Sequence, residues 1–186
     1  MPPPLMVRFH GGAAGPWRVT RMRALAGAAL PAVDRIAVQE GMAGAPGGAI
    51  AWTLAGSTGN QRYTERAEAD SLAARQQGLA RPEARHAALI PIRKSEAWWS
   101  LAQDERRAIL EAESRHIAIG MDYLPAVARR LHHSRELGEP FDFLTWFEFA
   151  PTHEAAFDEM LARLRAQREW DFVEREVEIR LVREEG

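Results

Sequence analysis

Aromatic and polar side chains alternate along the segment from Phe141 to Ala150. The residues that share one face of this segment are Phe141, Phe143, Thr145, Phe147 and Phe149. A period of two is typical of a β-strand, because successive side chains in a strand point to opposite faces. The last segment, from Val173 onward, alternates in the same way between aliphatic and charged residues. We therefore predict a strand at each of these two places.

Four shorter apolar runs also favour strands, because glycine-rich or proline-containing segments interrupt the chain around them. These runs are Leu5–His10, Trp17–Met22, Ala49–Leu54 and Ala87–Ile92.

Two helices are indicated by capping residues, one late in the first half of the chain and one near the end of the second half. Thr64 can cap a helix that runs to about Gln77, with Gly78 just beyond its end. Thr152 can cap another helix, in which the apolar residues recur at the 3.6-residue period of a helix face. The residues on that face are Phe157, Met160, Leu161 and Leu164.

A long helical region is expected between these two helices. Ser100 and Gln103 have the spacing of a capping box, and the charged, amphipathic stretch that follows includes His116. Gly120 and Pro125 should interrupt the helix, and a second helical stretch is expected to reach about His133.

The predicted order of the second half is strand, long helical region, strand, helix, strand. Helices packed on one face of an antiparallel sheet define the α+β class, most simply with a ferredoxin-like arrangement. The first half can be a shortened copy of the same plan. We therefore expect two ferredoxin-like halves, residues 1–85 and residues 86–186, with the N-terminal half shortened.

Composition narrows the chemistry. The 186 residues are 46% hydrophobic and 27% charged, with a net charge of −2, so no basic field favours nucleic acid or an anionic membrane. The chain has no cysteine, which excludes disulfides, thiol catalysis, iron–sulfur clusters and thioether-attached haem. No apolar run is long enough for a transmembrane helix, and no signal peptide is evident, so cytoplasmic residence is expected.

His116 and Arg129 lie thirteen positions apart. A neutral imidazole can ligate a haem iron on one side, and a permanently charged guanidinium can receive a small anion on the other. The interval alone is weak evidence, but it occurs together with other motifs in a consistent order. With it, the segments Ile90–Trp99, Arg130–Gly138 and Phe141–Glu148 resemble the chlorite dismutase family, and the short length resembles its compact, dimeric branch.

The resemblance implies a homodimeric enzyme of two ferredoxin-like halves, a dimeric α+β barrel, with one non-covalent haem b in the C-terminal half of each subunit. Such an enzyme converts chlorite to chloride and dioxygen and forms the O–O bond. His116 matches the axial ligand of the haem iron, Glu169 the carboxylate that hydrogen-bonds it, and Arg129 the catalytic distal arginine. The resemblance further places six residues around the cofactor: Asn60, Tyr63, Lys94, Trp98, Thr145 and Phe147.

These roles are chemically coherent. A carboxylate that accepts a hydrogen bond from the Nδ1–H group makes the imidazole a more basic ligand. Chlorite and hypochlorite are both monoanions, so Arg129 would attract the first and retain the second, while an apolar wall excludes water.

Two alternatives remain at this point. Coproporphyrin-haem decarboxylases share the fold and the axial histidine but lack the distal arginine, so they resemble the chain less. A haem-binding or structural dimer without turnover is the other alternative, and the complete set of His116, Glu169 and Arg129 speaks against it. His132 and His133 suggest a metal site, but adjacent residues on a helix point about 100° apart, so we do not expect them to chelate.

Overall fold

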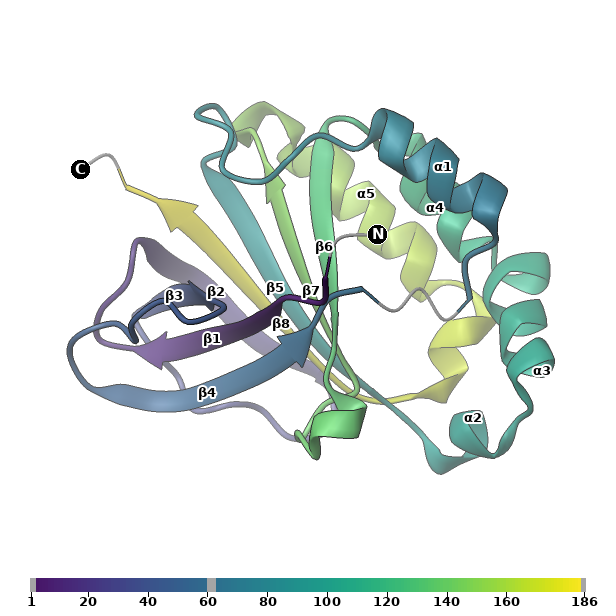
Figure 1. Ribbon diagram of the computed structural model, residues 1–186, viewed down its shortest axis with the longest axis horizontal. Coiled ribbons are helices and arrows are strands. Elements are labelled where there is room, and N and C mark those ends of the chain that lie inside the picture. Colours follow the sequence, from purple (N-terminus) through teal and green to yellow (C-terminus); the bar gives the residue numbers. More distant parts are fainter. Residues whose placement is uncertain (1–2, 60–62, 185–186) are drawn as a thin grey trace.

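The computed structural model describes residues 3–59 and 63–184. Its central feature is a closed barrel of eight antiparallel strands in the order β1-β3-β2-β8-β5-β7-β6-β4 (Figure 1). The strands are β1 Met6–Gly12, β2 Trp17–Ala26, β3 Arg35–Glu40, β4 Ile50–Ser57, β5 His86–Lys94, β6 Val127–His133, β7 Phe143–Phe149 and β8 Val173–Arg183.

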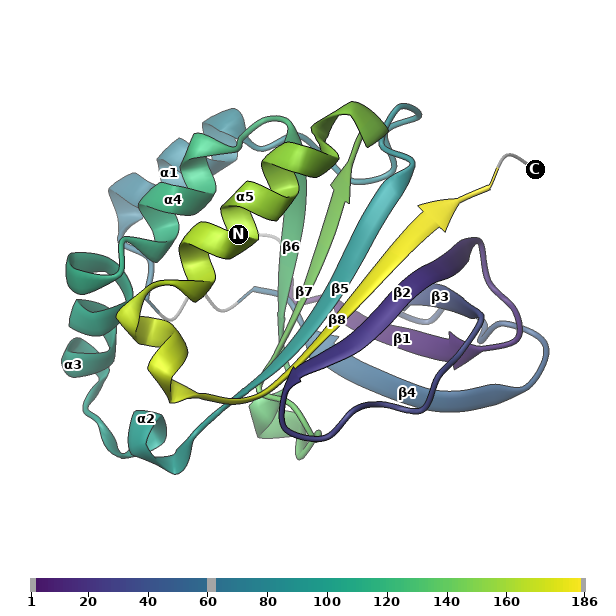
Figure 2. The ribbon, with the colours of Figure 1, turned by 180° about the vertical axis from the view of Figure 1, so that it is seen from behind.

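All α-helices lie on one side of the barrel, against the strands of the second half (Figures 1 and 2). They are α1 Arg66–Arg75, α2 Glu96–Ser100, α3 Gln103–Arg107, α4 His116–Asp122 and α5 Glu154–Arg165. Shorter elements connect them: a π-helical segment Ala108–Glu113 and the 3₁₀ segments Arg135–Leu137, Pro151–His153 and Arg168–Phe172. Within the described ranges, no helix is long and apolar enough to cross a membrane.

Two apolar cores lie on the two faces of the sheet. The barrel interior is filled by large side chains such as Phe9, Leu89, Trp146 and Ile179. The outer face of β5 and β7 packs through Ile90, Phe147 and Phe149 against Phe157, Met160, Leu161 and Leu164 of α5 and Ile119 of α4. The helical period expected for α5 and the alternation expected for β7 are therefore both confirmed.

The segment that ends at His133 differs from the sequence prediction. It is strand β6, in register with β7 from Val127 opposite Phe149 to His133 opposite Phe143, and not a helix. Local sequence favours neither state strongly here, because apolar residues recur at neither period. The partner strand decides, since β7 offers its whole length for pairing. In a strand His132 and His133 point to opposite faces, and no metal-binding cluster occurs among the described residues.

Element boundaries differ in smaller ways. Glu65, Ala102 and His153 stand at the N-caps where Thr64, Ser100 and Thr152 were expected. The long charged helix is divided at Ser114 and Arg115 into a π-helical segment and α4. Strand β3 was not predicted, because its six residues mix apolar and charged types. It forms by pairing with β1 on one side and β2 on the other.

Candidate functional site

His116 is the first residue of α4. The preceding Arg115 has φ 52°, a left-handed conformation that is costly for a residue with a Cβ and turns the chain sharply into the helix. The imidazole Nδ1 lies 2.6 Å from Oε2 of Glu169, and the side chain is 30% exposed. When Nδ1 carries the proton donated to the carboxylate, Nε2 keeps its lone pair and can ligate a metal.

Glu169 is buried in the 3₁₀ segment that follows α5. Its backbone N–H donates to the Ser114 hydroxyl at 3.0 Å, and its Oε1 accepts a hydrogen bond from Lys94 Nζ at 2.8 Å. Burial opposes the negative charge, but the adjacent His116 and Lys94 outweigh it and lower the pKa of Glu169 to about 2. The carboxylate is therefore ionised and shared between an imidazole and an ammonium group.

Two tryptophans lie beside Lys94, and one of them also stacks on His116. Lys94 Nζ lies 4.5 Å from the ring centroid of Trp98 and 5.6 Å from that of Trp170. Trp170 stacks almost parallel to the His116 imidazole, with centroids 6.4 Å apart and an interplanar angle of 11°, and its Nε1 donates to Glu176 at 2.8 Å. The predicted neighbours Lys94 and Trp98 are thus brought together with His116 and Glu169.

Trp99, next to Trp98, belongs to a different environment. Its Nε1 donates to Asp142 at 3.0 Å, and its ring stacks on Phe143. Trp98 is fully buried, and its Nε1 has no hydrogen-bond partner within residues 3–59 and 63–184. Trp98 is therefore the tryptophan that lies close to Lys94 and Glu169.

Arg129 lies on the outer face of β6, the face that the helices cover. It stands opposite Phe147 in the β6–β7 register, and Leu131 stands opposite Thr145 on the same face. Arg129 is half-buried, and burial lowers the pKa of its guanidinium. Its side chain forms no ion pair and no hydrogen bond with any residue that the structure describes. A partly desolvated guanidinium without a counter-ion can receive an anion.

The guanidinium of Arg129 lies against α4, the helix that begins with His116. A Cβ placed on Gly120 would lie only 2.0 Å from Nη1 of Arg129, so the guanidinium lies directly against the backbone of α4. Gly120 follows His116 by one helical turn and shares its face. The distal and axial residues expected from the sequence are therefore brought together, although Arg129 lies on a strand instead of a helix.

Tyr63 lies near the same tryptophan, with its ring edge-on to Trp98 at a centroid distance of 6.0 Å. Asn60 lies outside the described residues. Sequence reasoning missed Ser114, Gly120 and Trp170. Only Trp170 carried a signal, because it directly follows Glu169 in the chain.

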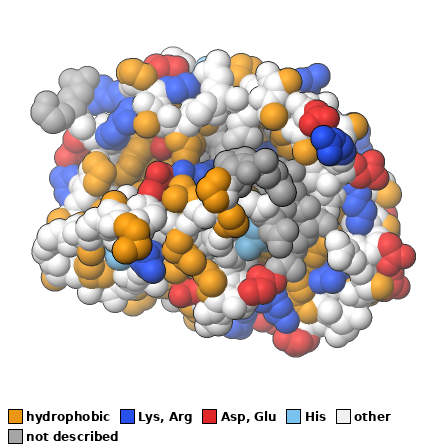
Figure 3. Space-filling view, viewed as in Figure 1, with side chains coloured by type: hydrophobic (Ala, Val, Ile, Leu, Met, Phe, Trp, Pro, Cys, Tyr) orange, Lys and Arg blue, Asp and Glu red, His pale blue; other side chains and the backbone are white. Residues whose placement is uncertain are grey.

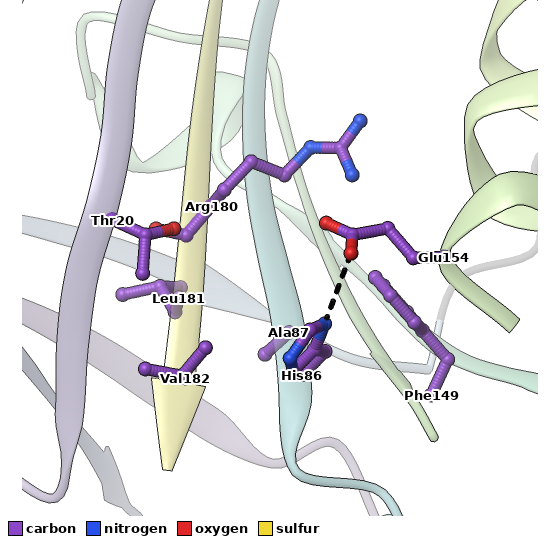
Figure 4. A pocket seen from close by; sticks show the side chains of 8 residues that line it. All are labelled: Thr20, His86, Ala87, Phe149, Glu154, Arg180, Leu181 and Val182. Carbon is purple, nitrogen blue, oxygen red and sulfur yellow. Dashed lines mark hydrogen bonds and ion pairs between the residues drawn. The ribbon is translucent and has the colours of Figure 1, made fainter. Parts of the chain in front are cut away.

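A separate pocket of about 190 Å³ lies between β2, β8, β5 and the start of α5. His86 and Glu154 face each other there across 3.6 Å, and Arg180 points toward them (Figure 4). Arg180 is already paired with Glu178 and Asp158, so its charge is compensated. The pocket shares no lining residue with the His116 site, and its charged side chains already have partners. On the molecular face in Figure 3, acidic and basic side chains are interspersed.

Comparisons with known proteins agree with this site. A family model described as chlorite dismutase matches residues 48–184. A curated chlorite dismutase from Ideonella dechloratans is 36% identical over 64 residues, which are 34% of this chain and 21% of the relative. The match therefore spans about a fifth of that relative's length.

Solved structures extend the comparison to nearly the whole chain. The crystal structure of a dimeric chlorite dismutase from Nitrobacter winogradskyi is 50% identical, with a TM-score of 0.88, covering 96% of this chain and 99% of that one. A chlorite dismutase variant from Candidatus Nitrospira defluvii shares the fold, with 16% identity and a TM-score of 0.65 over 96% and 90% of the two chains. The family match, the near-complete alignment and the shared fold together establish that this chain belongs to the chlorite dismutase family.

Proposed function

We propose that the protein is a haem b-dependent oxidoreductase that decomposes chlorite to chloride and dioxygen with formation of the O–O bond. The observation that carries the proposal is that a carboxylate-bound imidazole, His116, and a guanidinium without a counter-ion, Arg129, meet the same helix, α4. Family membership and the 50% identical dimeric chlorite dismutase support it.

The residues fit a haem. The His116 imidazole is partly exposed and fixed through Nδ1, which leaves Nε2 for iron. With no cysteine in the chain, the haem is held non-covalently, one per subunit. The proposed cofactor-binding residues are His116, Glu169, Lys94, Trp98, Tyr63, Asn60, Thr145 and Phe147.

When bound, haem supplies the iron at which chlorite gives up an oxygen atom. Glu169 keeps its negative charge throughout, holds the Nδ1 proton of His116 and thereby makes the imidazole a stronger electron donor. Lys94 holds the carboxylate in place through its other oxygen. Glu169 and Lys94 therefore fix the orientation of the His116 imidazole before substrate arrives.

Arg129 acts on the anions. Its guanidinium cannot deprotonate, so it attracts chlorite, orients it and then retains hypochlorite until both oxygen atoms are joined. Buried Phe147 and half-buried Thr145 line the same face and limit the access of water, which strengthens the single charge. No general acid or base is required of this side of the site.

We also propose that the chain forms a homodimer and that each subunit consists of two ferredoxin-like halves, residues 1–85 and 86–186. Within the ring of strands, β4-β1-β3-β2 and β8-β5-β7-β6 both run in the order fourth, first, third, second of their half. Helices follow the first and third strands in the second half, whereas plain loops occupy these places in the first half. Cytoplasmic residence and the absence of nucleic-acid and membrane partners stay predictions.

An oxygen electrode tests the function directly. The haem-reconstituted protein should release one dioxygen for each chlorite consumed, and His116→Ala should lose the wild-type Soret band and the activity together. A normal Soret band without dioxygen would indicate a non-catalytic haem-binding dimer. Decarboxylation of coproporphyrin haem in place of chlorite turnover would indicate the other branch of the wider family.

A further inference from the structure

Gly120 lies inside α4 at a position where the backbone does not require glycine. The glycines with positive φ are elsewhere in the described chain, at Gly15, Gly27, Gly41, Gly48, Gly59 and Gly138. Apart from proline, glycine is the least favourable residue in a helix interior, so alanine would suit the local structure better. The reason for glycine here therefore lies in the surroundings of the helix.

Those surroundings are the side chain of Arg129. A Cβ on Gly120 would lie 2.0 Å from Nη1, 2.9 Å from Cζ and 3.1 Å from Nη2. Ordinary contacts of a Cβ begin at 3.4 Å. The whole guanidinium is thus placed against bare backbone that any other residue would cover.

Space alone determines where this guanidinium lies. It has no ion-pair or hydrogen-bond partner among the described residues, and Phe147, opposite it in the sheet, offers none. Arginine has several rotatable bonds, so without polar partners its position follows from the room that its neighbours leave. The room is supplied by Gly120, one turn beyond His116 in α4.

We propose that Gly120 is a positioning residue for Arg129 and that the bare helix surface at Gly120 sets the affinity of the site for small monoanions. The inference deepens the proposed function and rests on it for the identity of the anion, chlorite. The contact between Gly120 and Arg129 is a property of the fold and stands independently of that identity.

The effect of a single methyl group follows from the geometry. The atom it meets is the far end of a flexible side chain, so the guanidinium moves while α4 stays in place. Restoring an ordinary contact requires a shift of at least 1.4 Å, the difference between 2.0 Å and 3.4 Å. Displacements of about 1 Å in a binding site suffice for large losses of function.

The test compares Gly120→Ala with Gly78→Ala. Gly78 is exposed, has no positive φ, and a Cβ there meets nothing within 4 Å, so it is a matched control for the same chemical change. Crystal structures should show the Arg129 guanidinium displaced by more than about 1 Å in Gly120→Ala, with α4 in its original position. A guanidinium that stays in place while the helix shifts would overturn the proposal, and this comparison requires neither haem nor activity.

Azide, titrated into the ferric reconstituted protein and followed at the Soret band, measures the functional consequence. We expect about tenfold weaker azide binding in Gly120→Ala and wild-type affinity in Gly78→Ala. In an Arg129→Ala background the Gly120→Ala change should alter azide affinity less than about twofold, because the group it displaces is gone. Equal weakening in both backgrounds would show that the methyl group acts without Arg129 and would refute the inference. If the reconstituted wild type does not decompose chlorite, but the azide affinities of the variants are as expected here, the proposed function is refuted and the inference about Gly120 stands.

Discussion

Replacing Glu169 with glutamine should destabilise the protein, and it should also raise the Fe(III)/Fe(II) potential of a bound haem. The substitution is nearly isosteric, but it removes a buried negative charge that the ammonium group of Lys94 and the imidazole of His116 share. Nζ of Lys94 is 2.8 Å from this carboxylate, and both side chains are about 5% exposed. Without the carboxylate, the ammonium group of Lys94 is buried beside neutral groups only: aromatic rings, a backbone carbonyl and the amide that replaces the carboxylate.

The magnitude follows from the cost of an uncompensated buried charge. Breaking a buried ion pair from one side costs about 3–5 kcal/mol, because the remaining ion has lost its solvation without a partner. For a chain of this size, each 1 kcal/mol corresponds to about 2–4 °C in the melting temperature, so the midpoint should fall by at least about 6 °C. This loss is a large fraction of the total stability of an ordinary domain.

Thermal unfolding of the protein before haem reconstitution measures this effect, and two further variants make it specific. Glu174→Gln is the matched control, since the Glu174–Arg93 pair is exposed and should contribute less than about 1 kcal/mol. Lys94→Met, added to Glu169→Gln, removes the stranded charge and should restore most of the stability. If Glu169→Gln melts with the wild type, or if the added Lys94→Met lowers the midpoint further, the buried pair does not have the role described.

The reconstituted Glu169→Gln protein should also show a raised Fe(III)/Fe(II) potential, because the imidazole loses anionic character. Glu174→Gln should leave the potential unchanged, since its side chain lies at the surface. An unchanged potential in Glu169→Gln would mean that the carboxylate does not act on the iron through His116.

Three other outcomes are expected. Arg129→Ala should lower chlorite turnover about ten- to hundredfold, and added methionine should protect its haem from bleaching more than that of the wild type, because hypochlorite escapes; wild-type turnover and durability would contradict this. Burial lowers the pKa of His132 to about 4, so the folded state binds fewer protons than the unfolded state as pH falls from 6.5 to 4, and this group should cost about 3 kcal/mol of stability at pH 4; His132→Asn should flatten the profile of melting temperature against pH by that amount. Light scattering should give twice the monomer mass of 20.8 kDa, and a monomer or a pentamer would refute the dimer.

The sequence predicted most of the strands, but not the element that carries Arg129. Alternation in the segment around Phe147 and the helical period around Phe157 are local signals, and both were confirmed. Strand β6 forms because β7 pairs with it across sequence-distant positions, which no local pattern records. The proximity of Arg129 to His116 was expected only from the family resemblance. Gly120 and Ser114 are ordinary residues in sequence, and only their contacts reveal what they do.

Strand β2 has a consequence for any attempt to divide the molecule. It belongs to the first half of the chain, yet it pairs with β8 from Trp17 to Ala26 and with β3 only at Trp17 and Arg18. The fragment 86–186 expressed alone would therefore expose the edge of β8 that β2 covers, and an open strand edge invites aggregation. The complementary fragment would carry β2 with almost nothing to pair with. The two halves are thus mutually dependent folding partners, and truncation between them should yield insoluble material instead of a smaller haem-binding module.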